Sequence, residues 1–260
     1  MKKTKITIIK LGGSIITDKT RPYTPNLPAI KRLAREIKKA GVPVVVVHGQ
    51  GSFAHTSAKK YGGKRGYKSL FGISTVFKDA MAINSIIIEE LLATKIPVVS
   101  FRPNSLFLSN NGKLKRNNLG VVLEALKQGL VPVLYGDVIM DTSWKTTIFS
   151  GEVSTRHMAL FLALHNITVD KIIQVGVTDG VYDDEGKTIK EITASSFGNI
   201  KKHLFATKTT DVTGGMQHKV EEAIRLAKLG IPTVILNGKK KNELFWTLRG
   251  KKSKFQTEII

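Results

Sequence analysis

Three short stretches combine lysine or histidine with glycine, the residue types that suit a site for an anion. The first is Lys10-Leu11-Gly12-Gly13-Ser14, which follows an apolar run. Because glycine lacks a Cβ, its backbone N–H groups can approach an anion closely, and Lys10 would hold its ammonium group over the same cavity. Taken alone, the stretch is equally compatible with an ordinary strand and turn that carry a solvent-exposed lysine.

The second stretch runs from His48 to His55 and also follows an apolar run. Its glycines at 49 and 51 match the loose dinucleotide fingerprint, but the first acidic residue beyond them is Asp79, and the fingerprint expects one about 20 residues on. A dinucleotide site is therefore disfavoured. We interpret His48 as a structural residue at a strand end and His55 as a hydrogen-bond donor to an anionic oxygen.

The third stretch covers residues 211–219 and contains Thr213, a pair of glycines and Lys219. Thr213 and the glycines are suited to cap the helix that follows, and the amino end of a helix favours phosphate. Lys219 would fall one turn inside that helix, within reach of the same anion. A glycine turn before an amphipathic helix is also commonplace, so this stretch does not define a site by itself.

The elements that would position these stretches alternate along the chain. Hydrophobic spacing predicts strands at 5–10, 42–47, 98–101, 131–136, 171–176 and 232–236, with a hairpin near 143–150. It predicts helices at 27–40, 70–94, 119–129, 153–165, 216–229 and 241–249. Such alternation indicates an α/β protein, a three-layer αβα sandwich around a mainly parallel sheet, formed by residues 1–260 as one domain. Ligands then bind beyond the carboxyl ends of the strands.

The composition limits the class of protein. The chain has 260 residues, 42% of them hydrophobic, and no cysteine, which excludes disulfides, thiolate catalysis and zinc–thiolate sites. No apolar run approaches the roughly 20 residues needed to span a bilayer. We expect a soluble cytoplasmic protein without a membrane partner.

The formal net charge is +21, and residues 1–68 hold 16 Lys or Arg against 2 Asp or Glu. Nucleic-acid binding, an anionic substrate and an adaptation of the whole proteome are three competing explanations. The lysines are scattered without interleaved aromatic residues, which disfavours nucleic acid as a partner. A strong positive field would still concentrate anionic ligands such as nucleotides.

Taken together, the motifs resemble the amino acid kinase superfamily, and within it most closely the archaeal isopentenyl phosphate kinases. The resemblance rests on these segments in this order: residues 10–14, 16–19, 48–55, 102–105, 135–137, 150–152, 178–182, 211–219 and 257–259. It covers nearly the whole chain. Fosfomycin kinases share much of the pattern and are the nearest alternative.

The resemblance implies an activity, a set of ligands and a role for each matching residue. The reaction would be the ATP-dependent phosphorylation of isopentenyl phosphate to isopentenyl diphosphate, with Mg²⁺ bound to ATP and a homodimer as the assembly. Lys19 would stabilise the phosphoryl group in flight, and His55 would bind the acceptor phosphate, with Gln50 and Gly151 beside it. The nucleotide would be bound by Lys10, Leu11, Gly12, Gly13, Ser14, Gly51, Asp179, Gly215 and Lys219. The acceptor would bind to residues of about 1–165 and the nucleotide to residues of about 166–260.

The chain departs from the superfamily pattern in its second loop, where Gln50 and Ala54 replace glycines, and after Ser150-Gly151, where Glu152 and Val153 replace aspartates. Val177 replaces a further aspartate. The alternative functions are a fosfomycin kinase or other small-acid kinase, and a non-catalytic relative that senses a nucleotide or phosphate or binds nucleic acid.

An isopentenyl tail would require an apolar slot. Helix 70–94 carries an apolar stripe that includes Ile73, Val76, Phe77, Ala80, Ile83 and Ile87. Core packing explains this stripe, but one end of it would also suit the wall of the slot. We hypothesise that Phe77, Ile83 or their neighbours limit the length of the tail.

Overall fold

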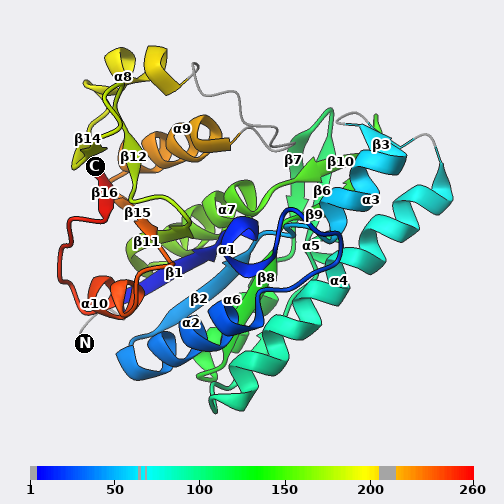
Figure 1. The fold of residues 1–260 in the computed structure, drawn as a ribbon. Helices are drawn as coiled ribbons and strands as arrows, with labels where there is room; N and C mark the ends of the chain where they lie inside the picture. Colours follow the sequence, from blue (N-terminus) through cyan, green and yellow to red (C-terminus); the bar gives the residue numbers. More distant parts are fainter. Residues whose placement is uncertain (1–4, 64–65, 68, 205–214) are drawn as a thin grey trace.

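The central feature of the computed structural model is a twisted sheet between two layers of helices (Figure 1). The structure describes residues 5–63, 66–67, 69–204 and 215–260. Within these residues the main sheet has eight strands, in the order β14-β16-β15-β11-β1-β2-β8-β5. The strands are β1 (Lys5–Leu11), β2 (Val44–His48), β5 (Val98–Ser100), β8 (Val131–Tyr135), β11 (Thr168–Gly176), β14 (Glu191–Ile192), β15 (Thr233–Asn237) and β16 (Gln256–Ile259).

The six strands from β15 to β5 are all parallel to one another, and only β16 pairs antiparallel with its neighbour β15. The predicted mainly parallel sheet is confirmed. Its central strands carry continuous apolar runs because both faces are covered, and every residue of β2 is buried. The carboxyl ends of β1, β2, β8 and β11 therefore reach the same edge of the sheet, where the glycine stretches begin.

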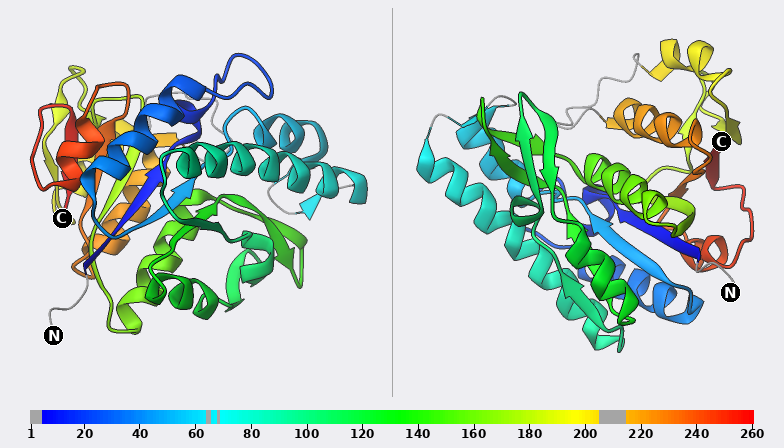
Figure 2. Two further views of the ribbon diagram at one scale, coloured as in Figure 1. Left: turned by 90° about the horizontal axis from the view of Figure 1, so that it is seen from below. Right: turned by 180° about the vertical axis from the view of Figure 1, so that it is seen from behind.

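The helices form one layer on each face (Figure 2). One layer contains α2 (Leu27–Ala40), α4 (Leu70–Ala93) and α10 (Glu243–Leu248), whose apolar residues share one core cluster with the sheet. The other contains α6 (Gly120–Lys127), α7 (Gly151–Leu164) and α9 (Gly215–Ala227). The predicted three-layer sandwich is thus confirmed, and most predicted boundaries are correct within a few residues.

Several short elements were not predicted. A second sheet has the order β10-β9-β6-β7 and is built from β6 (Phe107–Asn110), β7 (Lys113–Asn117), β9 (Asp137–Asp141) and β10 (Lys145–Phe149). Only its β9–β10 hairpin corresponds to the one expected near 143–150. The others are β14 and β16 of the main sheet, and α1 (Gly13–Ile16), α3 (Ala54–Tyr61), β3 (Gly62–Gly63), β4 (Gly66–Tyr67), α5 (Pro103–Leu106), β12 (Val181–Tyr182), β13 (Thr188–Ile189) and α8 (Phe197–Leu204).

Helix α4 is long and apolar enough to cross a membrane by length and composition alone, although the sequence was expected to hold no such run. Lys78 and Asp79 interrupt its apolar residues, and 44% of its apolar 18-residue stretch is buried inside the protein. Ile83, Ile87 and Leu91 pack into the core beneath the sheet. These contacts are those of a core helix that covers a sheet face.

Candidate active site

The loops after β1 and β2 touch each other through their glycines. A Cβ built on Gly13 would lie 2.5 Å from the backbone nitrogen of Gly51, and one on Gly49 would lie 2.8 Å from the nitrogen of Gly13. Gly51 also has a φ of +52°, a left-handed conformation that favours glycine. The two loops approach this closely only because the residues in contact are glycines, which have no side chain. Together they form a floor of backbone groups at the sheet edge.

A pocket opens above this floor and brings together the three lysines and the histidine that the sequence singled out. It is lined by Lys10 from the end of β1, Lys19 from the loop after α1, His55 from the first turn of α3, and Lys219 from α9. Its empty volume, including open solvent at its mouth, is about 730 Å³. Segments far apart in the sequence thus direct positive charge at one space, as a site for two phosphate groups requires.

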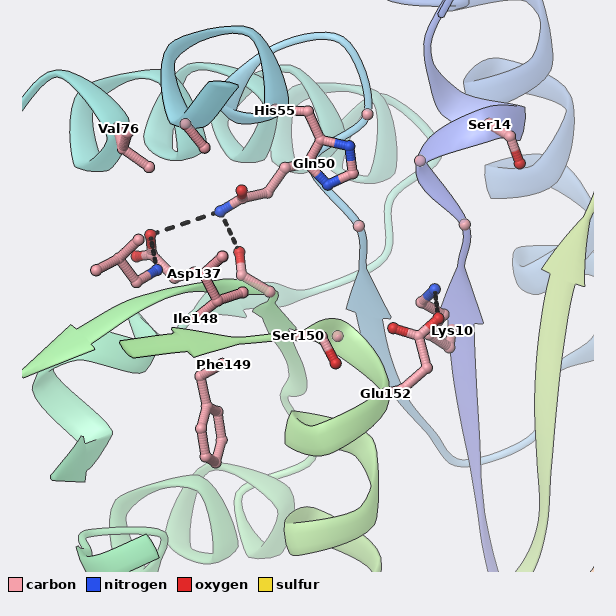
Figure 3. A pocket seen from close by; sticks show the side chains of 18 of the residues that line it. Lys10, Ser14, Gln50, His55, Val76, Asp137, Ile148, Phe149, Ser150 and Glu152 are labelled. Carbon is pink, nitrogen blue, oxygen red and sulfur yellow. Dashed lines mark hydrogen bonds and ion pairs between the residues drawn. The ribbon is translucent and has the colours of Figure 1, made fainter. Parts of the chain in front are cut away.

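Lys10 is held by a buried ion pair. Its Nζ donates a hydrogen bond to Oε1 of Glu152, in the first turn of α7 (Figure 3), and the side chains are 6% and 7% exposed. Burial alone would raise the pKa of Glu152, but the ammonium groups of Lys10 and Lys219 outweigh burial and hold the pKa well below its ordinary value. Glu152 therefore remains ionised and lies where it attracts two of the pocket's lysines.

Helix α9, which carries Lys219, is tied to α7 by polar contacts. Arg156 on α7 pairs with Glu222 on α9, and Glu222 also accepts a hydrogen bond from Arg225 at 2.6 Å. Ser150 Oγ, which caps α7 by accepting from the Val153 N–H, lies 3.3 Å from Nε2 of His218. These contacts place Lys219 beside the start of α7, and hence beside Glu152.

We expect Glu152→Gln to lower kcat by about 10- to 100-fold, because Lys10 and Lys219 lose the charge that holds them near the same point. The free energy of unfolding should fall by about 3 kcal/mol or more, since the change leaves the Lys10 ammonium buried without its partner. Steady-state kinetics and chemical denaturation measure the two effects. Glu124→Gln, which removes an exposed pair with Lys127, is the matched control and should change neither quantity.

The two histidines of the second loop have different surroundings: one is buried in the fold and the other lines the pocket. His48 is fully buried, its Nδ1 donates to the carbonyl oxygen of Gly49 at 2.8 Å, and its Nε2 accepts from Nδ2 of Asn84 at 3.0 Å. Burial lowers the pKa of His48 to about 4, so the ring stays neutral at physiological pH. The structural interpretation of His48 is confirmed. His55 lines the pocket instead.

Gln50 spans the pocket from the second loop to the turn between β8 and β9. Its Nε2 donates to the carbonyl oxygen of Gly136 and lies 3.5 Å from Oδ1 of Asp137 (Figure 3). Gln50 therefore lines the pocket, and part of its donor capacity is already used by Gly136, so its contact with the acceptor stays a prediction. Gly151, also predicted, lies against the Lys10 side chain, where a Cβ would be only 3.1 Å from Cε of Lys10.

Asp137 is a site residue for which the sequence suggested no role. It lines the pocket, is 3% exposed, and its Oδ1 accepts the N–H of Val138 at 2.8 Å. Burial raises the pKa of its carboxyl to about 8, despite the opposing hydrogen bonds from Val138 and Gln50. The sequence did contain a signal for this residue, because Gly136 and Asp137 directly follow the buried strand β8, as the first two glycine loops follow β1 and β2.

We expect Asp137→Asn to flatten the pH dependence of stability. The carboxyl has a higher pKa in the folded chain than its ordinary value of 3.8, so its contribution is present below pH about 4 and is lost as pH rises through about 8. Between these limits the free energy of unfolding of the wild type should fall by on the order of a few kcal/mol, and that of the variant should not. Thermal unfolding of both proteins between pH 5 and 9 measures this, and parallel profiles would contradict it.

The opposite wall of the pocket is apolar. It contains Ala58 from α3, Val76 from α4, and Val138 and Ile148 from the β9–β10 hairpin. Of the α4 residues in the tail hypothesis, Val76, the neighbour of Phe77, lies at this wall, whereas Phe77 and Ile83 do not. Ile83 is fully buried in the core beneath the sheet, and Phe77 packs beside the pocket residues without lining the cavity, so Val76 is the α4 residue at the wall.

The predicted nucleotide residues are only partly gathered here. Gly12, Gly13, Ser14 and Gly51 line the pocket, but the side chain of Leu11 is buried in the core. Asp179 and Gly215 lie outside the lining, and Oδ1 of Asp179 accepts from Nδ2 of Asn237 at 2.6 Å. Residues 211–214, including Thr213, fall outside the described residues, so the expected cap of α9 is untested.

Comparisons with known proteins agree with the geometry. The model of the amino acid kinase family matches residues 5–237. The chain is 33% identical to the isopentenyl phosphate kinase of Methanocaldococcus jannaschii over 259 residues, which cover 94% of this chain and 95% of that protein. It is 30% identical to the isopentenyl phosphate kinase of Methanothermobacter thermautotrophicus, with 88% and 90% covered.

Solved structures give the same result for the fold. A structure of isopentenyl phosphate kinase has a TM-score of 0.82 and 26% identity and covers 98% of this chain and 100% of that one. N-acetylglutamate synthase from Neisseria gonorrhoeae has a TM-score of 0.71 at 15% identity, over 99% of this chain and 59% of that one, and shows likeness of fold alone.

Proposed function

The chain belongs to the amino acid kinase family, and from this we propose that it is an ATP-dependent kinase that phosphorylates isopentenyl phosphate to isopentenyl diphosphate. The observation that carries the proposal is the convergence of Lys10, Lys19, His55 and Lys219 on one pocket. Joining one phosphate to another brings two anions together. Cations from four separate segments suit that demand better than they suit a neutral acceptor.

The residues around the pocket divide into two roles. Lys10, Lys219 and the glycine loop Gly12-Gly13-Ser14, with Gly51 against it, would bind the ATP phosphates. His55 and Gly151 would contact the acceptor phosphate, with the Gln50 amide beside it, and Lys19 would stabilise the transferring group. A phosphate monoester oxygen is already ionised near neutral pH, so the reaction needs no general base. Charge stabilisation and positioning then account for the catalysis.

The residues present fit a nucleotide. The glycine floor leaves backbone groups open to phosphate where any Cβ would clash, and Lys10 lies at its edge. Mg²⁺ would enter with ATP, held largely by the phosphates and water, as is usual for this ion, and would neutralise phosphate charge. Asp179 and Gly215 remain proposed nucleotide residues on the side of β11 and α9.

The apolar wall formed by Val76, Val138, Ile148 and their neighbours supports a short hydrocarbon tail on the acceptor. In this arrangement residues of about 1–165 bind the acceptor and residues of about 166–260 bind the nucleotide. We place the activity in the cytoplasm, where ATP is available.

The product tests the proposal directly. Incubation with ATP, Mg²⁺ and isopentenyl phosphate should convert the monophosphate resonance into a diphosphate pair in phosphorus NMR, with one ADP released per diphosphate formed. ADP release without a new diphosphate would instead indicate ATP hydrolysis. An inactive but correctly folded protein that binds ATP would support a non-catalytic, nucleotide-sensing relative.

We also propose that the protein is a homodimer that pairs through the outer side of α4. This helix leaves Leu70, Phe71 and Leu92 exposed, by 80%, 70% and 51%, and the edge strand β5 lies beside it. Leu70 and Phe71 are adjacent at the start of the helix, and exposed apolar side chains that lie together are typical of an interface. Light scattering should give twice the chain mass of 28.6 kDa, and Phe71→Lys with Leu92→Lys should shift it toward one chain mass.

A further inference from the structure

A second concentration of positive charge lies away from the pocket, on α2 and on the segment 239–255 that contains α10. Together residues 27–40 and 239–255 hold twelve Lys or Arg against two Glu. Twelve minus two gives these segments a charge of +10, about half of the net charge of +21. The two helices lie side by side in both views (Figures 1 and 2). Lysines that are separated in the sequence are therefore neighbours on one face.

Aromatic rings are interleaved with these lysines, contrary to the expectation from the sequence. Nζ of Lys251 lies 4.0 Å from the ring centroid of Trp246, and Nζ of Lys39 lies 4.6 Å from that of Phe245. The rings of Phe245 and Trp246 are 4.6 Å apart, and Nζ of Lys240 lies 4.6 Å from the ring of Phe255. The contacts of Lys39, Phe245, Trp246 and Lys251 are connected, and in them Trp246 remains 40% exposed while Phe245 is buried.

The surface also contains a groove. Arg32, Arg35, Lys39 and Lys241 line it together with Asn242. Its one acidic member, Glu36, is 4% exposed, and its oxygens already accept from Arg32 and from the N–H groups of Asn242 and Phe245. Among the described residues, Arg35, Lys39, Lys241 and Lys251 form no ion pair with an acid. Their charge is thus directed to the solvent.

We propose that this α2–α10 basic surface, defined by Arg35, Lys39, Lys241 and Lys251 near Trp246 and by Lys240 and Lys254 over Phe255, binds single-stranded nucleic acid. A row of cations neutralises successive phosphates and releases their counterions. The exposed ring of Trp246 beside those cations offers contact to an unstacked base, which a duplex or a lipid headgroup does not present. No residue of this surface lines the kinase pocket, so binding here is separate from phosphoryl transfer.

Trp246 supplies the probe. The chain has two tryptophans, and the other, Trp144, lies in the β9–β10 hairpin, so Trp144→Phe leaves Trp246 as the only tryptophan. Titration of that protein with a 15-nucleotide single strand of mixed sequence, as DNA and as RNA, should quench its fluorescence. We expect a Kd on the order of 10 µM at low salt, weakening steeply as salt is added.

A charge-matched pair of variants separates a local surface from bulk charge. Lys241→Glu with Lys251→Glu should weaken single-strand binding by about tenfold and reduce the salt slope by about 1.4, from about 0.7 for each lost phosphate contact. Lys113→Glu with Lys115→Glu makes the same change in net charge at exposed positions of β7 and should weaken it less than twofold. Kinase activity should be equal in both.

Three results would overturn the proposal. One is equal weakening in both double variants, which would indicate bulk charge. Another is tighter binding of a 15-base-pair duplex, or of vesicles that contain anionic lipid, than of the single strand. The third is the absence of any quenching of Trp246 at low salt while the protein remains folded by circular dichroism.

Discussion

Replacing Lys19 by alanine should lower kcat by about 10²- to 10³-fold while changing the Kd for ATP by less than about threefold. A preorganised cation that stabilises charge as it develops contributes a few kcal/mol to the transition state and little to the ground state. Lys19 lines the pocket from an exposed loop, so its loss removes charge without opening a buried cavity. Steady-state kinetics and equilibrium ATP binding separate the two quantities.

The loop that carries Lys19 offers a close control. Arg21, two residues away and also exposed, pairs with Asp18 at 2.9 Å and does not line the pocket. Arg21→Ala should therefore retain kcat within a factor of about two. A Lys19→Ala protein with nearly wild-type turnover, or with ATP binding and turnover reduced in parallel, would contradict a role confined to the transferring group.

Replacing His55 by alanine should lower kcat/KM for the phosphorylated acceptor by about 10- to 100-fold and leave ATP affinity largely unchanged. A hydrogen bond to a charged group contributes about 1.5–3 kcal/mol, and its loss leaves the acceptor phosphate without that donor. His165→Ala, a change at a histidine beyond the end of α7, controls for the removal of an imidazole. An unchanged kcat/KM for the acceptor in His55→Ala would exclude its contact with the acceptor phosphate.

The positions of the lysines and glycines were predictable because strand order and strand polarity decide them. Once β1 and β2 are read as buried parallel strands, Gly12-Gly13 and Gly49-x-Gly51 must meet at one edge of the sheet. The boundaries of α2 were equally predictable from local sequence, since Asn26 caps its first turn and Gly41 ends it with a φ of +62°. Local chemistry and periodicity sufficed for these features.

Features that depend on tertiary contacts were not predictable. The apolar stripe of α4 is compatible with several rotations of the helix about its own axis. Only the structure shows that Val76 faces the pocket while Ile83 faces the sheet. The raised pKa of Asp137 arises from its burial at the start of β9, beside Gln50 of the second loop, and this burial depends on the folded chain. The strand β16 depends on antiparallel pairing with β15, a long-range contact.

The distribution of charge shows the same limit. Lysines of α2 and of residues 239–255 are about two hundred positions apart in the sequence. Their scatter along the chain indicates only a solvated surface. Packing of α10 against α2 brings them together and places Lys39 over Phe245. Composition therefore established the size of the positive field, whereas the fold decides where it is concentrated.

The central claim, that four cations surround a site for two phosphate groups, is tested most directly by ranking acceptors. ADP release should be measured with isopentenyl phosphate, isopentenol, fosfomycin and N-acetylglutamate under the same conditions. We predict the highest kcat/KM for isopentenyl phosphate, at least 100-fold above that for isopentenol, which has the same tail without the phosphate. Equal rates for these two, or a preference for either of the small acids, would contradict the account.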